Sequence, residues 1–451
     1  MQLIPLRLHP YSARETSSHP GSATRPLALV SLDWTRPKDP RVSLGHASLL
    51  AAVRAAGVAV AEFVYRIEDP RFDWRTVVAD LDVARHPHRD IAFGAYVWNE
   101  HHLQRILPAL RAGGFRGRVI LGGPQVSYAS GGLEALYPAV DIFIRGYGEQ
   151  ALTNVLTSPD PTRYPGVHLA GQKFVGGQAQ VDLERLPSPY LTGALPVAQE
   201  QPFLRWETQR GCPFRCNFCQ HREPGQRLLR RELADPRIMA EIDLFVRHQV
   251  RDIAVLDPIF NASGPNGHRP TAILQRFADL GFTGRLSLQC RFEMLRDDFL
   301  EACQHLKVRL EFGLQTIHRA EQVAIDRKNN MKRVGEAIAR LHRYGIPFEV
   351  SLIYGLPEQT LNSFIQTVDW CLKRRIPVIK AFPLMLLRGT DLDRHRHRWG
   401  LVENDEPIPA VIASNTFTRT EWREMRDLAV ALSNSEGAHP DSLQQLMEVA
   451  A

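Results

Sequence analysis

Two successive runs of alternating strands and helices constrain the fold of this chain more than any other feature. In the first run, short apolar stretches alternate with helical patterns between residues 27 and 152. A similar alternation begins again at Phe203 and continues to about residue 390. The segment between them, 158–200, is rich in Gly and Pro and predicts a linker. Alternation of this kind is typical of parallel sheets covered by helices, so we expect an α/β protein.

The first run predicts a flavodoxin-like, doubly wound parallel sheet. Such sheets bind ligands beyond the carboxyl ends of their strands, so the segments that follow the strands are the candidate ligand site. The five expected strands are Leu27–Leu32, Val58–Tyr65, Ile91–Val97, Val119–Leu121 and Val140–Ile144.

The second run predicts an open, partial (β/α)6 barrel, because six strands fit an open barrel better than a second flat sheet. The six expected strands are Phe203–Glu207, Asp252–Leu256, Leu286–Leu288, Val308–Phe312, Phe348–Ile353 and Val378–Phe382. The expected divisions of the chain are a flexible amino-terminal segment 1–26, a doubly wound domain 27–157, a linker 158–200, a barrel 201–392 and a helical cap 393–451.

Composition excludes several classes of protein. An apolar fraction of 44% over 451 residues is that of a chain able to bury cores. No apolar stretch approaches the ~20 residues that span a bilayer, and residues 1–26 lack the layout of a secretory signal, so we expect a cytoplasmic protein without membrane association. The net charge of +6 comes from scattered basic residues, and we do not expect nucleic acid as a partner.

Three of the six cysteines fall within eight residues, after a stretch of more than 200 residues without any. Cys212, Cys216 and Cys219 form a CxxxCxxC spacing directly after an expected strand. Three thiolates on one loop can bind three irons of a [4Fe–4S] cluster and leave the fourth iron open to a small molecule. A structural zinc ion is the main inorganic alternative, but it requires a fourth ligand that only a strained His221 would supply. The isolated Cys290, Cys303 and Cys371 are interpreted as core or surface cysteines.

From about residue 205 to 390 the chain resembles the radical SAM (S-adenosylmethionine) superfamily. The cysteine motif carries the resemblance, and weaker matches follow in the expected order. Phe218 precedes the last cysteine of the motif. Asp257 lies in a segment that resembles the one beside the SAM amine in this family. Gln289 and Arg291 lie in a segment that resembles the region near the SAM carboxylate and ribose. Gln315 belongs to the fourth-strand segment, and Gly355, next to Tyr354, belongs to the fifth-strand segment near adenine.

The resemblance implies a mechanism. SAM would bind the open iron through its amine and carboxylate, and an electron from the reduced cluster would split it into methionine and a 5′-deoxyadenosyl radical. Cofactors supply this reactivity, while the protein orients them and excludes water and oxygen. Tyr354 is the candidate for moving a proton or an electron.

Residues 27–152 resemble the cobalamin-binding domains that precede many radical SAM barrels. Paired glycines after a strand let a bulky cofactor approach the backbone. The candidate cobalamin contacts are Gly45, Tyr96, Trp98, Asn99, Gly122, Gly123, Pro124 and Gly146.

One departure from cobalamin domains of the methionine synthase type concerns the cobalt ligand. Those domains use a DxHxxG loop, and aligning its glycine with Gly45 places Pro40 and Val42 at the Asp and His positions. We therefore expect cobalamin without a histidine lower ligand, or a domain that has lost its cofactor. His46 is interpreted as a helix-end residue. The pairs His86/His88 and His395/His397 are interpreted as solvated, whereas His101 and His102 lie nearer the expected corrin pocket.

The resulting prediction is a cobalamin-dependent radical SAM enzyme, and methylation of an unactivated carbon is its most common reaction. The alternatives are a radical SAM cyclase or rearrangement enzyme of secondary-metabolite or tetrapyrrole biosynthesis, and a non-catalytic corrinoid carrier or sensor. A methylthiotransferase is disfavoured, because those enzymes carry three further cysteines in an amino-terminal domain and residues 1–211 contain none. The expected partners are a small-molecule or peptide substrate and a reducing protein such as flavodoxin or ferredoxin.

Overall fold

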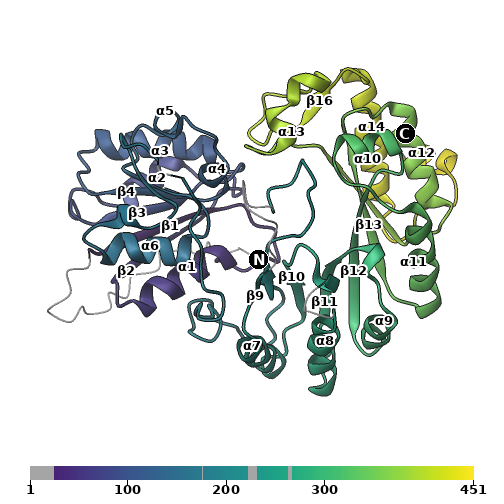
Figure 1. Cartoon of the computed structure of the whole chain (residues 1–451), viewed down its shortest axis with the longest axis horizontal. Helices are drawn as coiled ribbons and strands as arrows, with labels where there is room; N and C mark the ends of the chain where they lie inside the picture. Colours follow the sequence, from purple (N-terminus) through teal and green to yellow (C-terminus); the bar gives the residue numbers. More distant parts are fainter. Residues whose placement is uncertain (1–24, 175, 222–230, 263–266, 451) are drawn as a thin grey trace, which may run out of the picture.

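The structure is a computed structural model, and it describes residues 25–174, 176–221, 231–262 and 267–450. Two α/β domains lie side by side, the amino-terminal one in purple and blue and the carboxy-terminal one in green and yellow (Figure 1). The segment 1–26, expected to be flexible, lies outside the described residues except for its last two.

The front domain is a six-stranded sheet in the order β2-β1-β3-β4-β5-β6. Its first five strands are parallel, which confirms the expected flavodoxin-like sheet. The strands are β1 (Leu27–Asp33), β2 (Val60–Arg66), β3 (Asp90–Gly94), β4 (Val119–Gly122), β5 (Ile142–Ile144) and β6 (Val167–Leu169). The helices are α1 (Leu44–Ala55), α2 (Trp74–Asp80), α3 (Glu100–Ala112), α4 (Pro124–Ser127), α5 (Leu133–Leu136) and α6 (Gly148–Thr157), with a 3-10 turn at Pro161–Arg163.

Strand β1 explains why this domain has long apolar runs. Every residue of β1 is buried, because helices cover both faces of the sheet. Ala28, Val30 and Leu32 point into one core, whereas Leu27 and Leu29 point into the other.

The segment 158–200 differs from the expected linker. It supplies β6, which pairs antiparallel with β5 at the edge of the sheet. The chain then returns so that Ala179 bridges to Gly146. The Gly and Pro residues of this segment produce turns that close it onto the front domain.

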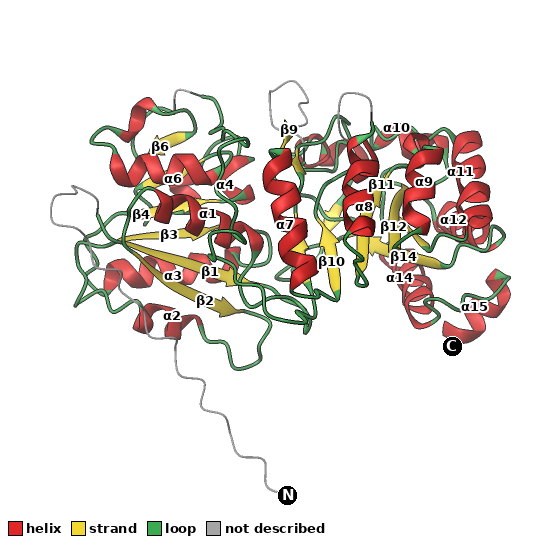
Figure 2. Cartoon of the chain, turned by 90° about the horizontal axis from the view of Figure 1, so that it is seen from below, coloured by secondary structure: helices red, strands yellow, loops and turns green. Residues whose placement is uncertain are grey.

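The second domain is an open barrel of six parallel strands in the order β14-β13-β12-β11-β10-β7, as expected. Its strands are β7 (Leu204–Trp206), β10 (Asp252–Val255), β11 (Arg285–Cys290), β12 (Lys307–Gln315), β13 (Phe348–Tyr354) and β14 (Val378–Pro383). Helices line the outer face of the strands, as Figure 2 shows for α7, α8 and α9. The helices are α7 (Asp235–Arg247), α8 (Arg269–Asp279), α9 (Asp297–Gln304), α10 (Arg319–Ala324), α11 (Met331–Tyr344) and α12 (Leu361–Leu372), with 3-10 turns at Phe260–Ala262 and Phe292–Met294. A short pair, β8 (Gln209–Arg210) and β9 (Arg231–Glu232), flanks the cysteine segment.

Local signals in the sequence begin and end several of these helices. Asn330 caps α11 by accepting a hydrogen bond from the backbone of Arg333, and Gly345 ends that helix in the left-handed region at φ 65°. Thr360 and Ser363 form a capping box at the start of α12.

The main helix of the carboxy-terminal segment packs against the wall of the barrel. This helix, α14, contacts β13, β14 and α12, and so takes the place of the helix that follows the sixth strand. Met425, Leu428 and Leu432 of α14 are buried in the barrel core. The remaining elements are α13 (Asp391–Arg394), a 3-10 turn (Arg396–Trp399), β15 (Val402–Glu403), β16 (Val411–Ala413), α14 (Arg419–Asn434) and α15 (Leu443–Ala450).

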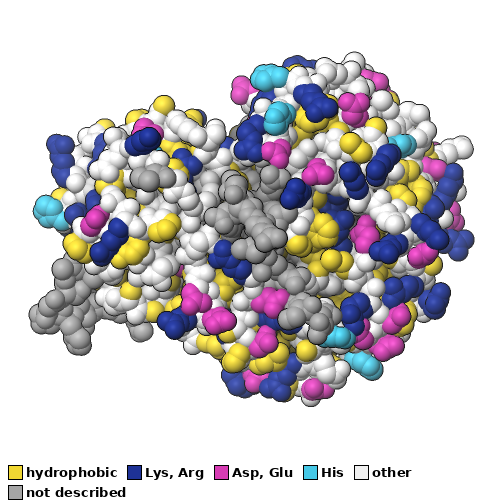
Figure 3. Space-filling model, in the orientation of Figure 1, with side chains coloured by type: hydrophobic (Ala, Val, Ile, Leu, Met, Phe, Trp, Pro, Cys, Tyr) yellow, Lys and Arg dark blue, Asp and Glu magenta, His cyan; other side chains and the backbone are white. Residues whose placement is uncertain are grey.

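The distribution of charge on the surface and the character of the helices follow the sequence pattern. Lys and Arg side chains are interspersed with Asp and Glu on the face drawn in Figure 3. In the part of the chain that the structure describes, no helix combines the length and apolar character needed to cross a membrane.

Candidate active site

The three clustered cysteines line one cavity at the carboxyl end of the barrel strands. The cavity has a volume of about 250 Å³. Its lining comes from the cysteine segment and from the ends of β10 to β13: Cys212, Phe214, Cys216, Phe218, Cys219, His221, Pro258, Ile259, Gln289, Cys290, Arg291, Glu311, Gly313, Gln315, Arg327 and Ser351. This end of a barrel is where enzymes of the fold place their reacting groups.

The structure therefore brings together the cysteine triad, Phe218, Gln289, Arg291 and Gln315, which are distant in sequence. Gln315 ends β12 with φ 68°, an unusual backbone conformation for a residue with a side chain. Strain of this kind is commonly stored at functional positions.

The cysteine segment is anchored to the loop after α10. The backbone N–H of Asn217 donates to the carbonyl of Ile325 (3.1 Å), and its side-chain amide donates to the carbonyl of Ala324 (2.6 Å). On the other side, the N–H of Leu392 donates to the carbonyl of Asn217 (3.0 Å). Asn217, between two of the cysteines, thus fixes the middle of the segment.

The chemistry of the triad fits a metal cluster. Burial raises the pKa of the Cys212 thiol and raises that of Cys219 to about 11. A metal must therefore displace the thiol protons, since pH alone does not remove them near neutrality. The three cysteines line the cavity. Among the described residues, no group of three or more His, Cys, Asp or Glu side chains is arranged to hold a single metal ion.

Arg327 is a cavity residue that the sequence reasoning missed. Its Nη1 donates to Sγ of Cys216 (3.5 Å), and its Nη2 donates to the carbonyl of Gly313. Its Nε is buried without a hydrogen-bond partner. Arg327 lies twelve residues beyond the end of β12, where no strand-end pattern marks it.

Arg291 adds a second guanidinium to the same cavity. It lies over the ring of Phe214, with 3.9 Å from Cζ to the ring centroid, and its Nε is 3.4 Å from Oε2 of Glu293. Its backbone is fixed by Asn261, which exchanges two hydrogen bonds of 2.9 Å with it. Two cationic side chains therefore face the thiols.

Asp257 does not line the cavity, contrary to expectation. Its buried carboxylate accepts hydrogen bonds from the backbone N–H groups of Thr208 (2.7 Å) and Gln209 (3.1 Å), and from the Thr208 hydroxyl. Its neighbours Pro258 and Ile259 reach the cavity instead. Asp257 thus supports the strand end that leads into the cysteine segment.

Burial raises the pKa of Asp257 to about 7, although the hydrogen bonds from Thr208 and Gln209 favour the charged form. The folded chain then binds this proton more tightly than the unfolded chain, whose carboxyl pKa is about 3.9. The contribution of protonated Asp257 to the free energy of unfolding is therefore fully present below about pH 4 and is lost as the pH rises through about 7. The free energy of unfolding changes by at most about 1.4 kcal/mol per pH unit over this range.

We therefore expect Asp257→Asn to flatten this slope, because the amide has no titrating proton. Its oxygen can still accept from the backbone N–H groups of Thr208 and Gln209, and its NH₂ group can donate to the Thr208 hydroxyl. Chemical denaturation at pH 5, 6, 7 and 8, followed by tryptophan fluorescence, measures the slope. Parallel pH profiles for the wild type and the variant would contradict the prediction.

Tyr354 and Gly355 also lie away from the cavity lining. The ring of Tyr354 packs against Phe364 and Trp422, with centroids 5.8 and 5.9 Å apart, and burial raises its pKa to about 12. The N–H of Gly355 donates to Oε1 of Gln359 (2.7 Å). Strand β13 points Tyr354 toward α12 and α14, so the expected proton or electron role has no geometric support.

The front domain has its topological switch point between β1 and β3, which is where doubly wound sheets bind ligands. Asn99 bridges the two strand ends, since its amide donates to the carbonyls of Leu32 (3.2 Å) and Gly94 (2.9 Å) and its Oδ1 accepts from the N–H of Tyr96 (2.9 Å). Asn99 therefore fixes the two strand ends at this edge, and both of its amide hydrogens are engaged in hydrogen bonds within the protein.

Aromatic side chains gather at the same edge. The rings of Tyr96 and Trp98 stack with centroids 4.5 Å apart and an interplanar angle of 11°. The hydroxyl of Tyr96 lies beside Gly45 at the start of α1. Trp34, directly after β1, is 59% exposed, and the sequence reasoning missed it because it lies outside every motif. Exposed aromatic surface at a switch point indicates a ligand-binding edge.

The paired glycines have a structural explanation that differs from the expected cofactor contact. A Cβ at Gly123 would lie 2.6 Å from the carbonyl oxygen of Ala95, and one at Gly146 would lie 2.5 Å from that of Ala179. Both also have positive φ values, 93° and 95°. Neighbouring backbone thus occupies the space at these two glycines. Gly122 and Pro124 belong to the same turn, at the end of β4 and the start of α4.

The histidines considered in the sequence analysis differ in their surroundings. His46 is buried on α1, with Nε2 3.8 Å from Oε2 of Glu62, so it faces β2 and not the carboxyl edge. The rings of His101 and His102 lie with their centroids 3.8 Å apart and are tilted by 43°. Burial, with His101 nearby, lowers the pKa of His102 to about 4.

A second cavity, of about 580 Å³, lies between the front domain and the carboxy-terminal segment. Its front-domain wall comes from α3 and α4, and its other wall comes from residues 385–409. The lining residues are Val97, Glu100, His101, Gln104, Arg105, Gln125, Met385, Leu386, Leu387, Arg388, Asp393, Arg396, Glu403, Asp405, Glu406, Pro407 and Pro409.

An open barrel with three thiols at its carboxyl end is the architecture of radical SAM proteins. Residues 206–371 match the family model of the radical SAM superfamily, so this part of the chain is a radical SAM domain. This confirms the expected class and, with it, a [4Fe–4S] cluster and SAM as its cofactors.

The chain is also similar to two curated methyltransferases. It is 29% identical over 300 residues to the cobalamin-dependent radical SAM methyltransferase TokK of Streptomyces tokunonensis, covering 61% of this chain and 43% of TokK. It is 30% identical over 369 residues to the 2-(S-pantetheinyl)-carbapenam-3-carboxylate methyltransferase of Streptantibioticus cattleyicolor, covering 75% of this chain and 50% of the relative. The chain thus spans about half the length of these curated relatives.

A solved structure shares the whole fold. The radical SAM methyltransferase TsrM of Kitasatospora setae, with cobalamin and a [4Fe–4S] cluster bound, superposes with a TM-score of 0.68 at 16% identity, covering 89% of this chain and 85% of TsrM. At this identity the likeness establishes the two-domain fold.

Proposed function

We propose that this chain is a cobalamin-dependent radical SAM enzyme that methylates an unactivated carbon of a small molecule. One observation carries the proposal: the ligand edge of the front sheet meets the carboxyl end of the barrel. Segments that follow front strands contact the cysteine side of the barrel through Asp39, Glu100, Tyr128 and Glu149. Cofactors bound at the two edges would therefore share one space.

When bound, the cluster and SAM supply a 5′-deoxyadenosyl radical, and cobalamin supplies a methyl group. The chain's own residues hold and shield these groups. Cys212, Cys216 and Cys219 would hold the cluster, and Gln289, Arg291 and Gln315 would line the SAM site. Phe214 and Phe218 add apolar surface that keeps water out of the cavity.

On the front domain, Trp34, Tyr96 and Trp98 would contact the corrin ring, because they present aromatic surface at the switch point. We propose that cobalamin binds there without a histidine lower ligand, and the orientation of His46 toward Glu62 of β2 supports this.

The reaction also needs an electron. We propose a one-electron protein donor such as a flavodoxin or a ferredoxin, and a cytoplasmic location, where thiols stay reduced. The six cysteines are all free thiols, which accords with that compartment.

Anaerobic reconstitution with iron and sulfide, followed by incubation with hydroxocobalamin, SAM and a chemical reductant that supplies the electrons, tests the proposal. Radical formation leaves 5′-deoxyadenosine and methionine, whereas methyl transfer leaves S-adenosylhomocysteine. About one corrin per chain together with both nucleoside products would support the methyltransferase. A cluster with 5′-deoxyadenosine but no retained corrin would contradict the cobalamin part and favour a radical SAM enzyme of another kind.

We expect Trp34→Ala to lower corrin retention about tenfold, because an exposed aromatic anchor commonly contributes more than about 1 kcal/mol to binding. Val430→Ala, which removes a 50% exposed apolar side chain from α14, is the matched control. Gel filtration after incubation with hydroxocobalamin, followed by absorbance of the protein fraction, measures retention. Equal retention by both variants would remove Trp34 from the site.

A further inference from the structure

The segment 210–221, which we call the cluster loop, contains all three cysteines of the triad. Both of its ends contact the front domain. The two contacts join residues that are 61 and 92 positions apart along the chain, so the front domain contributes to the geometry of a site that lies in the barrel.

At the first end, Arg210 is held by a buried ion pair. Its Nη2 lies 2.8 Å from Oε1 of Glu149, in the first turn of α6, and 2.7 Å from Oε1 of Glu207. The side chains of Arg210 and Glu149 are only 13% and 7% exposed. Ser48 of α1 donates a further hydrogen bond to Glu149 (2.9 Å). Arg210 is two residues before Cys212, so this pair fixes the entry to the loop.

At the second end, Gln220 is held from two sides. The hydroxyl of Tyr128, directly after α4, donates to the carbonyl of Gln220, and the side-chain amide of Gln220 donates to the carbonyl of Arg388 (2.9 Å). Arg388 in turn lies 2.8 Å from Oε1 of Glu100, in the first turn of α3. Gln220 directly follows Cys219, so these bonds fix the exit from the loop.

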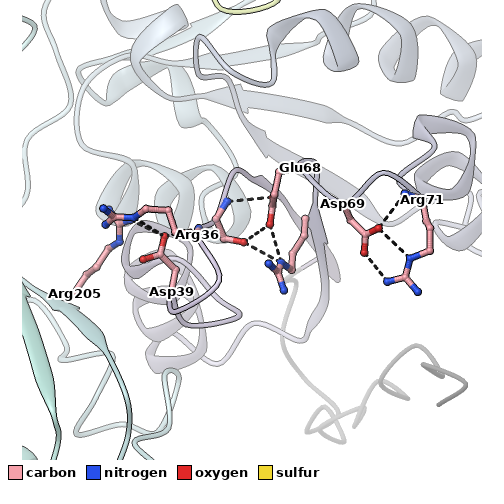
Figure 4. Close-up of polar contacts among 8 residues, drawn as sticks. Arg36, Asp39, Glu68, Asp69, Arg71 and Arg205 are labelled. Atoms are coloured by element: carbon pink, nitrogen blue, oxygen red, sulfur yellow. Dashed lines mark hydrogen bonds and ion pairs between the residues drawn. The ribbon is translucent and has the colours of Figure 1, made fainter. Parts of the chain in front are cut away.

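The Arg210–Glu149 contact differs from an ordinary surface salt bridge because both of its side chains are buried. Exposed pairs contribute about 0–1 kcal/mol, but removing one partner of a buried pair leaves a charge without solvent and is strongly unfavourable. A third contact, between Asp39 and Arg205 of β7 (2.8 Å), supports the same interface (Figure 4). Burial disfavours the charged form of Asp39, yet hydrogen bonds from Arg36 and Arg205 leave its pKa below the usual value.

We propose that the front domain acts as a clamp on the cluster loop, through Glu149 at one end and Tyr128 at the other, and thereby slows the loss of iron from the cluster. This role rests on the cluster at the triad but not on cobalamin. It gives the front domain a function even in a chain that binds no corrin.

The test uses the full chain, reconstituted anaerobically with iron and sulfide and without cobalamin. The rate at which a ferrous-iron chelator removes iron is followed by absorbance for Glu149→Gln, Tyr128→Phe and the double variant. The matched controls are Glu62→Gln and Tyr65→Phe, which remove an ion pair and a hydrogen bond within the front domain. Thermal unfolding of each variant checks that the fold is retained.

We expect iron release to be about threefold faster in each single variant and about tenfold faster in the double variant, with both controls within twofold of the wild type. Release from the double variant at the wild-type rate would overturn the clamp. Equal acceleration by the controls would also overturn it, since general destabilisation would then account for the effect. Corrin retention, measured separately, decides the proposed function, and a wild-type chain that takes up no iron would overturn both.

Discussion

Replacing Cys212, Cys216 or Cys219 with serine is expected to abolish stable iron binding and reductive cleavage of SAM. Loss of a residue that only supports a metal ligand costs about 10-fold to 100-fold in affinity or activity, so loss of a ligand itself costs more than about 100-fold. Iron per chain after anaerobic reconstitution and the yield of 5′-deoxyadenosine with a chemical reductant measure the two effects.

The chain offers its own controls for this experiment. Cys303 and Cys371 are buried in the barrel core, are 1% and 0% exposed, and do not line the cavity. Replacing either with serine places a hydroxyl in an apolar site, so some stability is lost, but iron binding is expected to persist. Cys290 is unsuitable as a control because it lines the cavity. Retention of iron and of SAM cleavage within tenfold by Cys216→Ser would refute the assignment of the triad.

The sequence predicted the architecture well because the signals that define it are local. Fully buried parallel strands produce apolar runs such as Leu27–Asp33, and their spacing identifies both sheets without any knowledge of contacts. The triad was equally visible, since its three ligands lie within eight residues of one another.

What the sequence could not give was the direction of side chains at strand ends. Asp257 and Pro258 are adjacent, yet only Pro258 reaches the cavity, because the Asp257 carboxylate turns toward the backbone of Thr208. Tyr354 turns toward Trp422, on a helix that sequence reasoning had placed over the barrel mouth. Contacts between residues tens of positions apart decide such orientations.

The paired glycines show the same limit. A positive φ and a crowded backbone require glycine at Gly123 and Gly146 whether or not a cofactor is near. The pattern was therefore a sign of close packing, and Trp34, which belongs to no pattern, presents more surface to a ligand.

Arg327 is expected to raise the reduction potential of the cluster. It places a cation and a hydrogen-bond donor on the Cys216 sulfur, at 3.5 Å, and hydrogen bonds to ligating sulfurs and local charge both set the potential of iron–sulfur clusters. Two unit charges about 5 Å apart interact by about 3 kcal/mol at an effective dielectric constant of about 20. The added electron is therefore better stabilised when Arg327 is present.

We expect Arg327→Met to lower the ratio of reduced to oxidised cluster about tenfold at a fixed applied potential, which corresponds to about 59 mV for a one-electron couple. Arg327→Lys keeps the charge but loses the planar group that contacts both Cys216 and Gly313, so an intermediate value is expected. Lys328→Met removes an exposed charge one residue away and serves as the control.

A redox titration followed by electron paramagnetic resonance of the reduced cluster distinguishes these variants without reference to turnover. Screening by solvent should leave the potential of Lys328→Met near that of the wild type, because an exposed charge acts through water. Equal reduction potentials for Arg327→Met and Lys328→Met would mean that the contact with Cys216 has no electronic effect. The role of Arg327 would then be only to connect the cluster loop with the end of β12.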